Sequence, residues 1–308
     1  MKLNPVLMLA LIFLPGLIYI GNPAFALLIG MGLTLAFNRI IVEGGQTYGS
    51  YLLQSAIILL GFKLNVSELL RISADYTLMV ALYVLSALLL GLVIAWLLRI
   101  EKTSGILMAS GTAICGGTTI ATLAPILKAR PDQVGVALAI VFLLNAFALI
   151  TFPYIGQYLQ LSQEQFGVWV AFAIHDTSSV VATAQIYGDE AARIATTVKL
   201  GRTLWLIPLV LAASFYARSE KASMRLPLFI VLFIAASVVG SLITIPSIVI
   251  SSIGWLSKSF LVVALFLIGT EITRETLKRI RGKVLAQALI LWALVVPGTL
   301  LAVKMLVL

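Results

Sequence analysis

Two short polar interruptions stand in an otherwise apolar sequence, and their residue types are those that could hold a charged solute. The first, Ser110–Thr119, combines glycines with hydroxyl side chains and Cys115. The second, Ala173–Ser179, contains His175 and Asp176, followed by three hydroxyl residues. Backbone amides and hydroxyl groups donate hydrogen bonds, while a histidine can exchange a proton near neutral pH. Both interruptions are therefore candidate binding segments.

Each interruption is flanked by two apolar stretches that are short enough to be half-helices. Ser104–Ala113 and Thr118–Leu127 flank the first, and the second divides Gln165–Tyr187. Glycines are costly inside a helix, so we predict that the helix breaks at each interruption. In a membrane, broken backbone persists only where protein or a watery cavity covers it, and transporters bind solutes at such breaks. The alternative is an ordinary transmembrane helix whose small residues allow close packing.

The composition indicates a polytopic membrane protein. The chain has 308 residues, of which 61% are hydrophobic and 11% are charged, and its mean hydropathy is +1.11. The net charge of +9 does not predict a nucleic-acid partner, because Lys and Arg gather in the cytoplasmic loops of membrane proteins. The single Cys115 excludes an internal disulfide. With no zinc spacing, phosphate-binding loop or nucleophile with a paired base, we expect neither an enzyme nor a bound metal or cofactor.

The apolar runs predict an all-α fold of about nine spanning helices plus two broken or re-entrant helical hairpins. We interpret the first run as a helix rather than as a removed signal peptide. The whole chain, residues 1–308, is expected to form a single transmembrane transporter domain. The predicted spans are Pro5–Ile20, Pro23–Phe37, Tyr48–Phe62, Tyr76–Leu98, Val134–Phe152, Ala191–Tyr216, Leu226–Ile243, Ile248–Ile268 and Val284–Leu301.

Two internal similarities predict that the chain is built from inverted repeats. Leu52–Ile72 aligns without gaps on Phe260–Ile280. A weaker similarity relates Gly116–Ala121 to Asp176–Val181, and a long apolar helix follows each. Chance similarity among apolar helices is the alternative explanation for both.

The distribution of Lys and Arg favours hairpins over single crossings. If each broken segment enters and leaves on one side, both repeat pairs become inverted and the basic residues gather on the side of the N-terminus. With single crossings, Lys128 and Arg130 move to the opposite side. The positive-inside rule therefore predicts two hairpins, a cytoplasmic N-terminus and an external C-terminus in a bacterial inner membrane. The predicted halves are residues 1–152 and 165–308.

The two second half-helices would bring their N-terminal ends to one shared site. A helix N-terminus presents unpaired N–H groups and a partial positive charge, which together favour an anion. The candidate substrate-binding residues are Ser110, Thr112, Cys115, Gly116, Gly117, Thr118, Thr119, Thr177, Ser178, Ser179, Lys199 and Arg202.

The ionisable residues near this site have both functional and structural interpretations. His175 and Asp176 are candidates for ion or proton coupling, since ionisable groups inside a membrane are functional candidates by default. Asp176 would equally serve as a plain helix N-cap. Lys199 and Arg202, one helical turn apart, could counter a bound anion, pair with Asp176, or extend to the membrane interface. Cys115 has a simple interpretation as a small residue at a tight tip.

Three motifs resemble the YeiH-type sulfate exporter family. They are Thr112–Gly116, Ile174–Ser178 with the following Ile194–Leu200, and Leu60–Leu64. The resemblance covers nearly the whole chain in the same order. It implies inverted repeats with broken helices and secondary transport of a small anion, with sulfate export as the usual assignment.

We therefore predict a secondary active transporter of a small anion, either sulfate or a related sulfonate or organic anion. We expect it to lie in the lipid bilayer and to export the anion with coupling to H⁺ or Na⁺. One rival is a cation/proton antiporter that uses Asp176 and His175. The other is a membrane sensor that moves no solute. The sequence leaves open whether the chain forms a homodimer.

Overall fold

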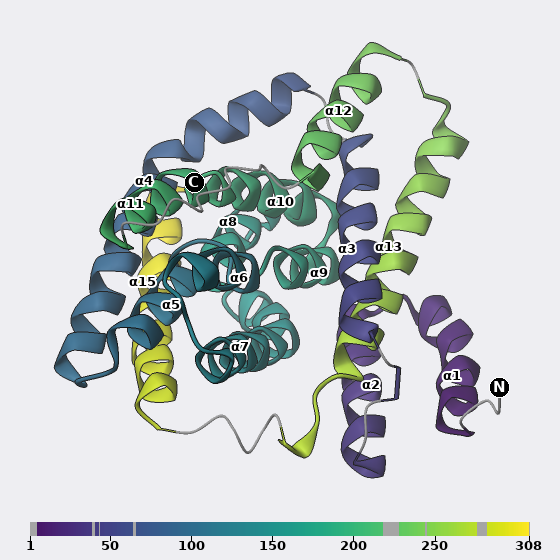
Figure 1. Ribbon diagram of the computed structural model, residues 1–308. Helices are drawn as coiled ribbons and strands as arrows, with labels where there is room; N and C mark the ends of the chain where they lie inside the picture. Colours follow the sequence, from purple (N-terminus) through teal and green to yellow (C-terminus); the bar gives the residue numbers. More distant parts are fainter. Residues whose placement is uncertain are drawn as a thin grey trace. The chain divides into compact units, whose positions relative to one another are not determined.

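The fold was taken from a computed structural model in which the regular structure of the described residues is helical (Figure 1). Contacts divide the chain into two compact units, one formed by residues 1–69 and 227–278 and the other by residues 70–226 and 279–308. Each unit takes residues from both predicted halves, and the inverted repeat itself stays a prediction. The described residues are 5–38, 41–42, 44–63, 66–217, 228–243, 245–275 and 282–307.

The first unit is a group of packed helices organised around α13. This helix packs along both α2 and α3, while α12 packs against α3 and α1 against α13. Asn22 caps the start of α2 by accepting hydrogen bonds from the amides of Ala24 and Phe25, and Pro23 occupies the first helical position, where no amide hydrogen is needed. The helices are α1 (Pro5–Ile20), α2 (Pro23–Phe37), α3 (Gly45–Gly61), α12 (Leu228–Leu242) and α13 (Ser247–Gly269).

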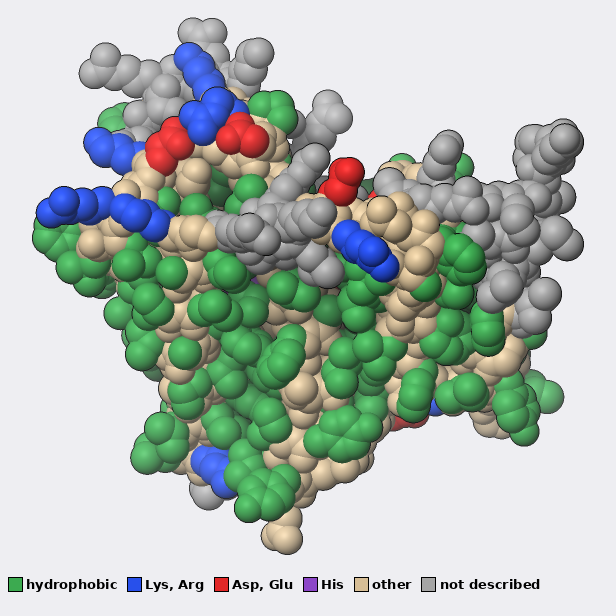
Figure 2. Space-filling view, turned by 90° about the horizontal axis from the view of Figure 1, so that it is seen from below, with side chains coloured by type: hydrophobic (Ala, Val, Ile, Leu, Met, Phe, Trp, Pro, Cys, Tyr) green, Lys and Arg blue, Asp and Glu red, His purple; other side chains and the backbone are tan. Residues whose placement is uncertain are grey.

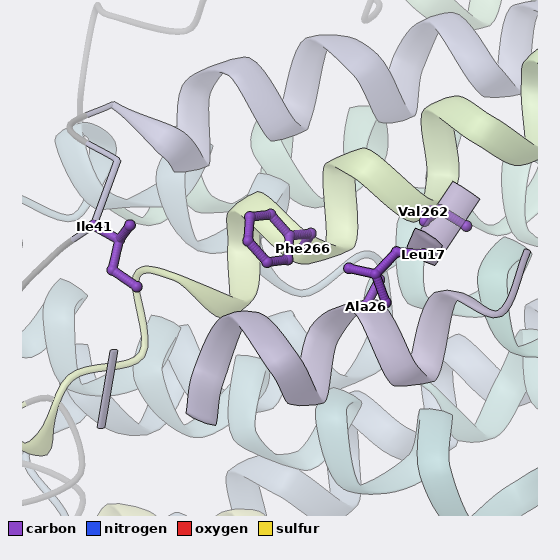
Figure 3. Packing of buried hydrophobic residues seen from close by; sticks show 5 residues of the cluster. All are labelled: Leu17, Ala26, Ile41, Val262 and Phe266. Atoms are coloured by element: carbon purple, nitrogen blue, oxygen red, sulfur yellow. The ribbon is translucent and has the colours of Figure 1, made fainter. Parts of the chain in front are cut away.

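A small hydrophobic cluster joins α1, α2 and α13 (Figure 3). Phe266 and Val262 lie one turn apart on α13, and Leu17 of α1 and Ala26 of α2 pack with them. Ile41, in the turn after α2, completes the cluster. All five side chains are buried, so the cluster fixes the first two helices on α13.

Glycines at the ends of α3 and α13 allow helix backbones to approach closely. A Cβ atom on Gly269 would overlap the carbonyl oxygen of Leu27 on α2. A Cβ atom on Gly61 would lie 2.6 Å from the carbonyl oxygen of Phe233 on α12. These two glycines are equivalent in the alignment of Leu52–Ile72 with Phe260–Ile280, so the repeated segments use the same packing device. Residues 64–65 of the first segment and 276–280 of the second lie outside the described part.

The second unit carries both interrupted segments. It contains most of α4 (Val66–Leu97), together with α5 (Lys102–Ala113), α6 (Gly117–Ile126), α7 (Pro131–Tyr158), α8 (Gln163–Ala173), α9 (Thr177–Tyr187), α10 (Asp189–Thr203), α11 (Leu206–Ala217) and α15 (Lys283–Leu306). The predicted run Ala191–Tyr216 is divided here into α10 and α11 by a turn at Leu204–Trp205. Pro208 explains the turn, because it lacks the amide hydrogen that would donate to Leu204 in a continuous helix.

Five stretches of the described chain are long and apolar enough to cross a bilayer, namely Leu69–Leu97, Pro131–Tyr158, Asp189–Phe215, Ser247–Gly269 and Lys283–Leu306. The other predicted spans, in α1, α2, α3 and α12, are apolar helices of 15 to 17 residues. Leu78, Leu82, Leu85 and Leu89 form an exposed stripe along α4. Figure 2 shows hydrophobic side chains over most of the visible face, with charged side chains towards its margins. Such surfaces are typical of helices that face lipid, and the chain is a multi-pass membrane protein.

The first interrupted segment folds back on itself. A straight path of 25 helical residues from α5 to α6 would separate its ends by roughly 35 Å. Instead Arg130, just after α6, forms an ion pair of 3.1 Å with Glu101, just before α5. The hydrogen bonds that Arg130 donates to Asp132 and Glu101 raise the pKa of its guanidinium. The segment is therefore a helical hairpin, which confirms the prediction from the charge distribution.

The second interrupted segment is a hairpin too. The ring of Tyr187, the last residue of α9, stacks on Phe166 in the first turn of α8 with 3.8 Å between the ring centroids. Gln163, the first residue of α8, accepts hydrogen bonds from the amides of Glu190 and Ala191 at the start of α10. Both ends of the segment therefore lie together, with the tip between α8 and α9 at the far end.

Candidate functional site

The tip of the first hairpin is shaped by Gly116. This residue has φ of 53° and ψ of −113°, a conformation that side-chain-bearing residues rarely adopt. A Cβ atom there would lie 2.9 Å from Val141 Cγ1 and 3.3 Å from His175 Cβ. Only glycine therefore allows this tip to lie against α7 and the second hairpin.

The two hairpin tips meet. Gly116 of the first tip is within contact distance of His175 in the second. Cys115 and His175 are both buried, with 2% and 1% of their surface exposed. The sequence analysis required these breaks to share one site, and the geometry brings them together within a single unit.

Asp176 is the N-cap of α9. Its carboxylate accepts hydrogen bonds from the amides of Ser178 and Ser179 and from both of their hydroxyl groups, the one from Ser179 Oγ at 3.0 Å. Asp176 therefore acts as a helix N-cap, the structural role that the sequence offered for it. Because its oxygens are engaged in this way, Asp176 already satisfies the amide end of α9.

The start of α6 has no such cap. Gly116 occupies the N-cap position and has no side chain that could accept from the amides of the first turn. The Thr119 hydroxyl accepts instead from the Cys115 amide at 3.2 Å and lies 3.1 Å from its Sγ. Thr118, in this first turn, is exposed. The partial positive charge at this helix end is thus left for a ligand.

Lys199 and Arg202 lie at the C-terminal ends of α5 and α8, the first half-helix of each hairpin. Arg202 donates to the carbonyls of Thr112 and Ala113 at the end of α5, and to those of Ala171 and Phe172 at the end of α8. Lys199 Nζ donates to the Ile174 carbonyl at 2.7 Å. Helix C-termini carry partial negative charge and unpaired carbonyls, so two cations are well placed there. Both side chains are fully buried and neither extends to an interface.

Arg202 therefore links the two hairpins. Its guanidinium carbon also lies 4.4 Å above the centre of the Tyr83 ring of α4, a cation–π contact. The hydrogen bonds of Lys199 and Arg202 go to backbone carbonyls rather than to Asp176, so the alternative of an ion pair with Asp176 is not found among these contacts. Their positive charges nonetheless lie beside the tips.

Asn145 is a site residue that the sequence analysis missed. It lies in the middle of α7, 2% exposed, and its Oδ1 accepts from the His175 amide at 3.1 Å. A single polar residue within the apolar run Val141–Phe147 was the available signal. Without the fold, nothing in the sequence connected it with His175.

Several buried polar atoms around the tips have no hydrogen-bond partner. They are Ser110 Oγ, Thr112 Oγ1, Asn145 Nδ2 and His175 Nε2. Buried polar groups are nearly always paired, so unpaired ones call for an explanation, such as a ligand, an ordered water or a functional role. Ser110 and Thr112 belong to the predicted site, whereas Thr177 and Ser179 are buried on the α9 side of it.

A cavity of ≈ 660 Å³ in the same unit is less suited to an anion. It lies between α4, α8 and α15, and its lining is mostly apolar, including Leu82, Phe172 and Leu294. Tyr83 lines this cavity and also contacts Arg202. A mostly apolar lining would give a charged solute few hydrogen bonds, so the hairpin tips are the better candidate.

Comparison with known proteins places the chain among membrane proteins. The family described as conserved hypothetical protein 698 matches residues 8–288. A UPF0324 membrane protein of Porphyromonas gingivalis is 40% identical over 284 residues, which covers 91% of this chain and 86% of the relative. One of Geobacter sulfurreducens is 40% identical over 282 residues, covering 92% and 91%, and one of Vibrio vulnificus is 42% identical over 255 residues, covering 81% and 82%. No solved structure matches the chain. The chain belongs to the family of UPF0324 membrane proteins.

Proposed function

We propose that this protein is a secondary active transporter that binds a small anion at the meeting point of the two hairpin tips. The observation that carries the proposal is the contact between Gly116 and His175, which joins the uncapped start of α6 to the second tip. Two hairpins that meet in the interior of a helical membrane protein are the arrangement that transporters use to expose a site to each side in turn.

The local charges favour an anion over a cation. Lys199 and Arg202 bring two positive charges to the tips, and the free amides of α6 add a partial positive charge. The carboxylate of Asp176 is the group that a cation would need, and it is engaged as the cap of α9. The cation/proton antiporter is therefore the second candidate, and it predicts cation movement that Asp176→Asn abolishes.

The first substrates to test are sulfate and related sulfonates or organic anions. The resemblance to the YeiH-type sulfate exporters names sulfate, and a tetrahedral oxyanion matches a site built from amides and hydroxyl groups. The direction is proposed as export from the cytoplasm across the bacterial inner membrane, coupled to H⁺ or Na⁺. The protein acts in this proposal without chemistry on its substrate, and so as a carrier rather than an enzyme.

The test is flux across a sealed membrane. Purified full-length protein in liposomes should move labelled sulfate or a sulfonate when a proton or sodium gradient is imposed, between about pH 5 and pH 8. Protein-free liposomes serve as the control. If no anion moves under any of these conditions, the transporter proposal fails. Binding of the labelled anion without movement would favour the membrane sensor.

A further inference from the structure

His175 and Asn145 form a buried pair whose hydrogen-bond directions can be assigned. The His175 backbone amide donates to Asn145 Oδ1 at 3.1 Å, and the ring Nδ1 lies 3.2 Å from the same oxygen. A backbone amide can only donate, so the atom of Asn145 that faces it must be the oxygen and not the NH₂ group. An oxygen accepts, so Nδ1 must carry a hydrogen.

The tautomer of His175 follows from this pairing. In a neutral imidazole only one nitrogen carries hydrogen, so Nε2 presents a lone pair. Both His175 Nε2 and Asn145 Nδ2 are buried and have no hydrogen-bond partner. A proton can therefore join Nε2 while the bond from Nδ1 to Asn145 stays in place.

The charged groups around this ring belong to α10 and to the N-cap of α9. Lys199 of α10 bonds the carbonyl of Ile174, the residue before His175, and Arg202 of α10 bonds the ends of α5 and α8. Asp176 follows His175 directly, Cys115 precedes Gly116 at the first tip, and Tyr83 on α4 contacts Arg202. If His175 is neutral while Lys199, Arg202 and Asp176 are charged, these groups leave a single positive charge.

We propose that His175 Nε2 takes up one proton when an anion with two negative charges binds at the start of α6, and that Asn145 is the positioning residue that leaves Nε2 free for it. This inference rests on the proposed transport function and specifies its coupling ion. An anion with one negative charge balances the excess positive charge by itself. An anion with two leaves one negative charge, which the proton on Nε2 cancels. Charge balance in a site of low dielectric favours binding of the two together.

The proton balance of the step is simple. The lone pair of Nε2 forms an N–H bond with a proton from water on the side from which the anion enters. The Nδ1–H bond to Asn145 neither forms nor breaks. When the anion leaves on the other side, the site regains its excess positive charge and the proton leaves Nε2 with it. Proton and anion therefore bind reciprocally, each raising the affinity of the other.

The experiment measures protons and anions together in liposomes that contain a pH-sensitive dye. For the wild-type protein we expect about one proton per sulfate, and no proton with methanesulfonate, which carries a single charge. His175→Gln, which cannot take up a proton, should lose the proton movement and slow sulfate at least about tenfold, but should slow methanesulfonate far less.

Asn145 is tested by a pair of variants. Asn145→Asp keeps an accepting oxygen and adds a negative charge that favours the charged imidazole, so the pH midpoint of sulfate movement should shift upward. Asn145→Leu removes the acceptor and should lower the ratio of protons to sulfate. A merely structural role would weaken transport in both variants without moving the midpoint. Thermal unfolding in detergent confirms that each variant is folded.

The outcomes separate this inference from the transporter proposal. If wild-type protein moves sulfate without protons, or if His175→Gln moves as many protons as wild-type, the inference is overturned while transport stands. If wild-type protein moves no anion, both are overturned. If His175→Gln does not fold, Asn145→Asp decides, and an unchanged pH midpoint overturns the inference.

Discussion

A single side chain, Arg202, holds both hairpins through backbone carbonyls. It donates to carbonyls of α5 and of α8 from a planar guanidinium that lysine cannot imitate. We expect Arg202→Lys to lower stability by about 3 kcal/mol, because buried carbonyls would lose their donors. The measurement is the thermal midpoint in detergent, together with anion flux, which should be lost.

Arg130→Lys is the matched control. Arg130 also makes ion pairs, but its side chain is 59% exposed, so the change should leave the thermal midpoint nearly unchanged. Equal thermal midpoints for the two variants would show that Arg202 does not hold the hairpins.

Adjacent glycines at the first tip should respond differently to a methyl group. Gly116→Ala places a Cβ atom at positive φ and 2.9 Å from Val141 Cγ1, and we expect a loss of about 2 kcal/mol or more and a failure of transport. At Gly117 the nearest atom to a Cβ would be Leu138 Cδ2 at 3.6 Å, an ordinary contact. Gly117→Ala should therefore fold with nearly the wild-type thermal midpoint. The reverse order would contradict the geometry of the tip.

At this scale the sequence singled out candidate residues, but it did not show what they contact. His175 and Asp176 stood out because they are ionisable residues in an apolar segment. The partners of Lys199 and Arg202 are backbone carbonyls, which every residue carries and which no pattern of side chains can identify. Asn145 was missed because one polar residue in an apolar helix does not show which neighbour it faces.

At the scale of elements, the start of α6 gives a charge-specific prediction. Thr118 lies exposed in the first turn, where an added carboxylate interacts favourably with the helix dipole. Thr118→Asp should therefore keep the stability of the protein while it repels an anion, so that anion affinity falls at least about tenfold. Thr118→Asn has the same shape without the charge and should lose far less. Equal losses in a binding assay with labelled sulfate would remove α6 from the site.

The positions of the helix breaks could be predicted because glycine and capping residues act locally. The expected half-helices Ser104–Ala113 and Thr118–Leu127 differ from α5 and α6 by two residues or fewer at each end. The turn at Leu204–Trp205 escaped prediction, since the apolar run continues through it and only Pro208 marks it. Hydropathy reports burial in lipid and says little about such local breaks.

At the scale of the whole molecule, the two units could not be predicted. Each combines segments that are far apart in the sequence, such as α3 with α12 and α5 with α15. Helix packing of this kind depends on the shapes of facing surfaces, with small residues such as Gly61 as the sole local signal. The charge distribution, in contrast, is a property of the whole chain, and it favoured hairpins correctly.

The hairpin topology makes a prediction about sidedness that spans the second unit. Glu101 and Arg130 form an ion pair, so the start of α5 and the start of α7 must face the same compartment. The 28 residues of α7 then carry the chain across the bilayer, so Gln157 near its end must face the other compartment.

Cysteines placed singly at Lys102 and Asp132 should react with an impermeant reagent from the cytoplasmic side, and a cysteine at Gln157 from the outside. Native Cys115 is buried and serves as the unreactive background. Reaction of Lys102→Cys and Asp132→Cys from opposite sides would contradict the hairpin. Reaction of both from the outside would keep the hairpin and reverse the proposed orientation of the chain.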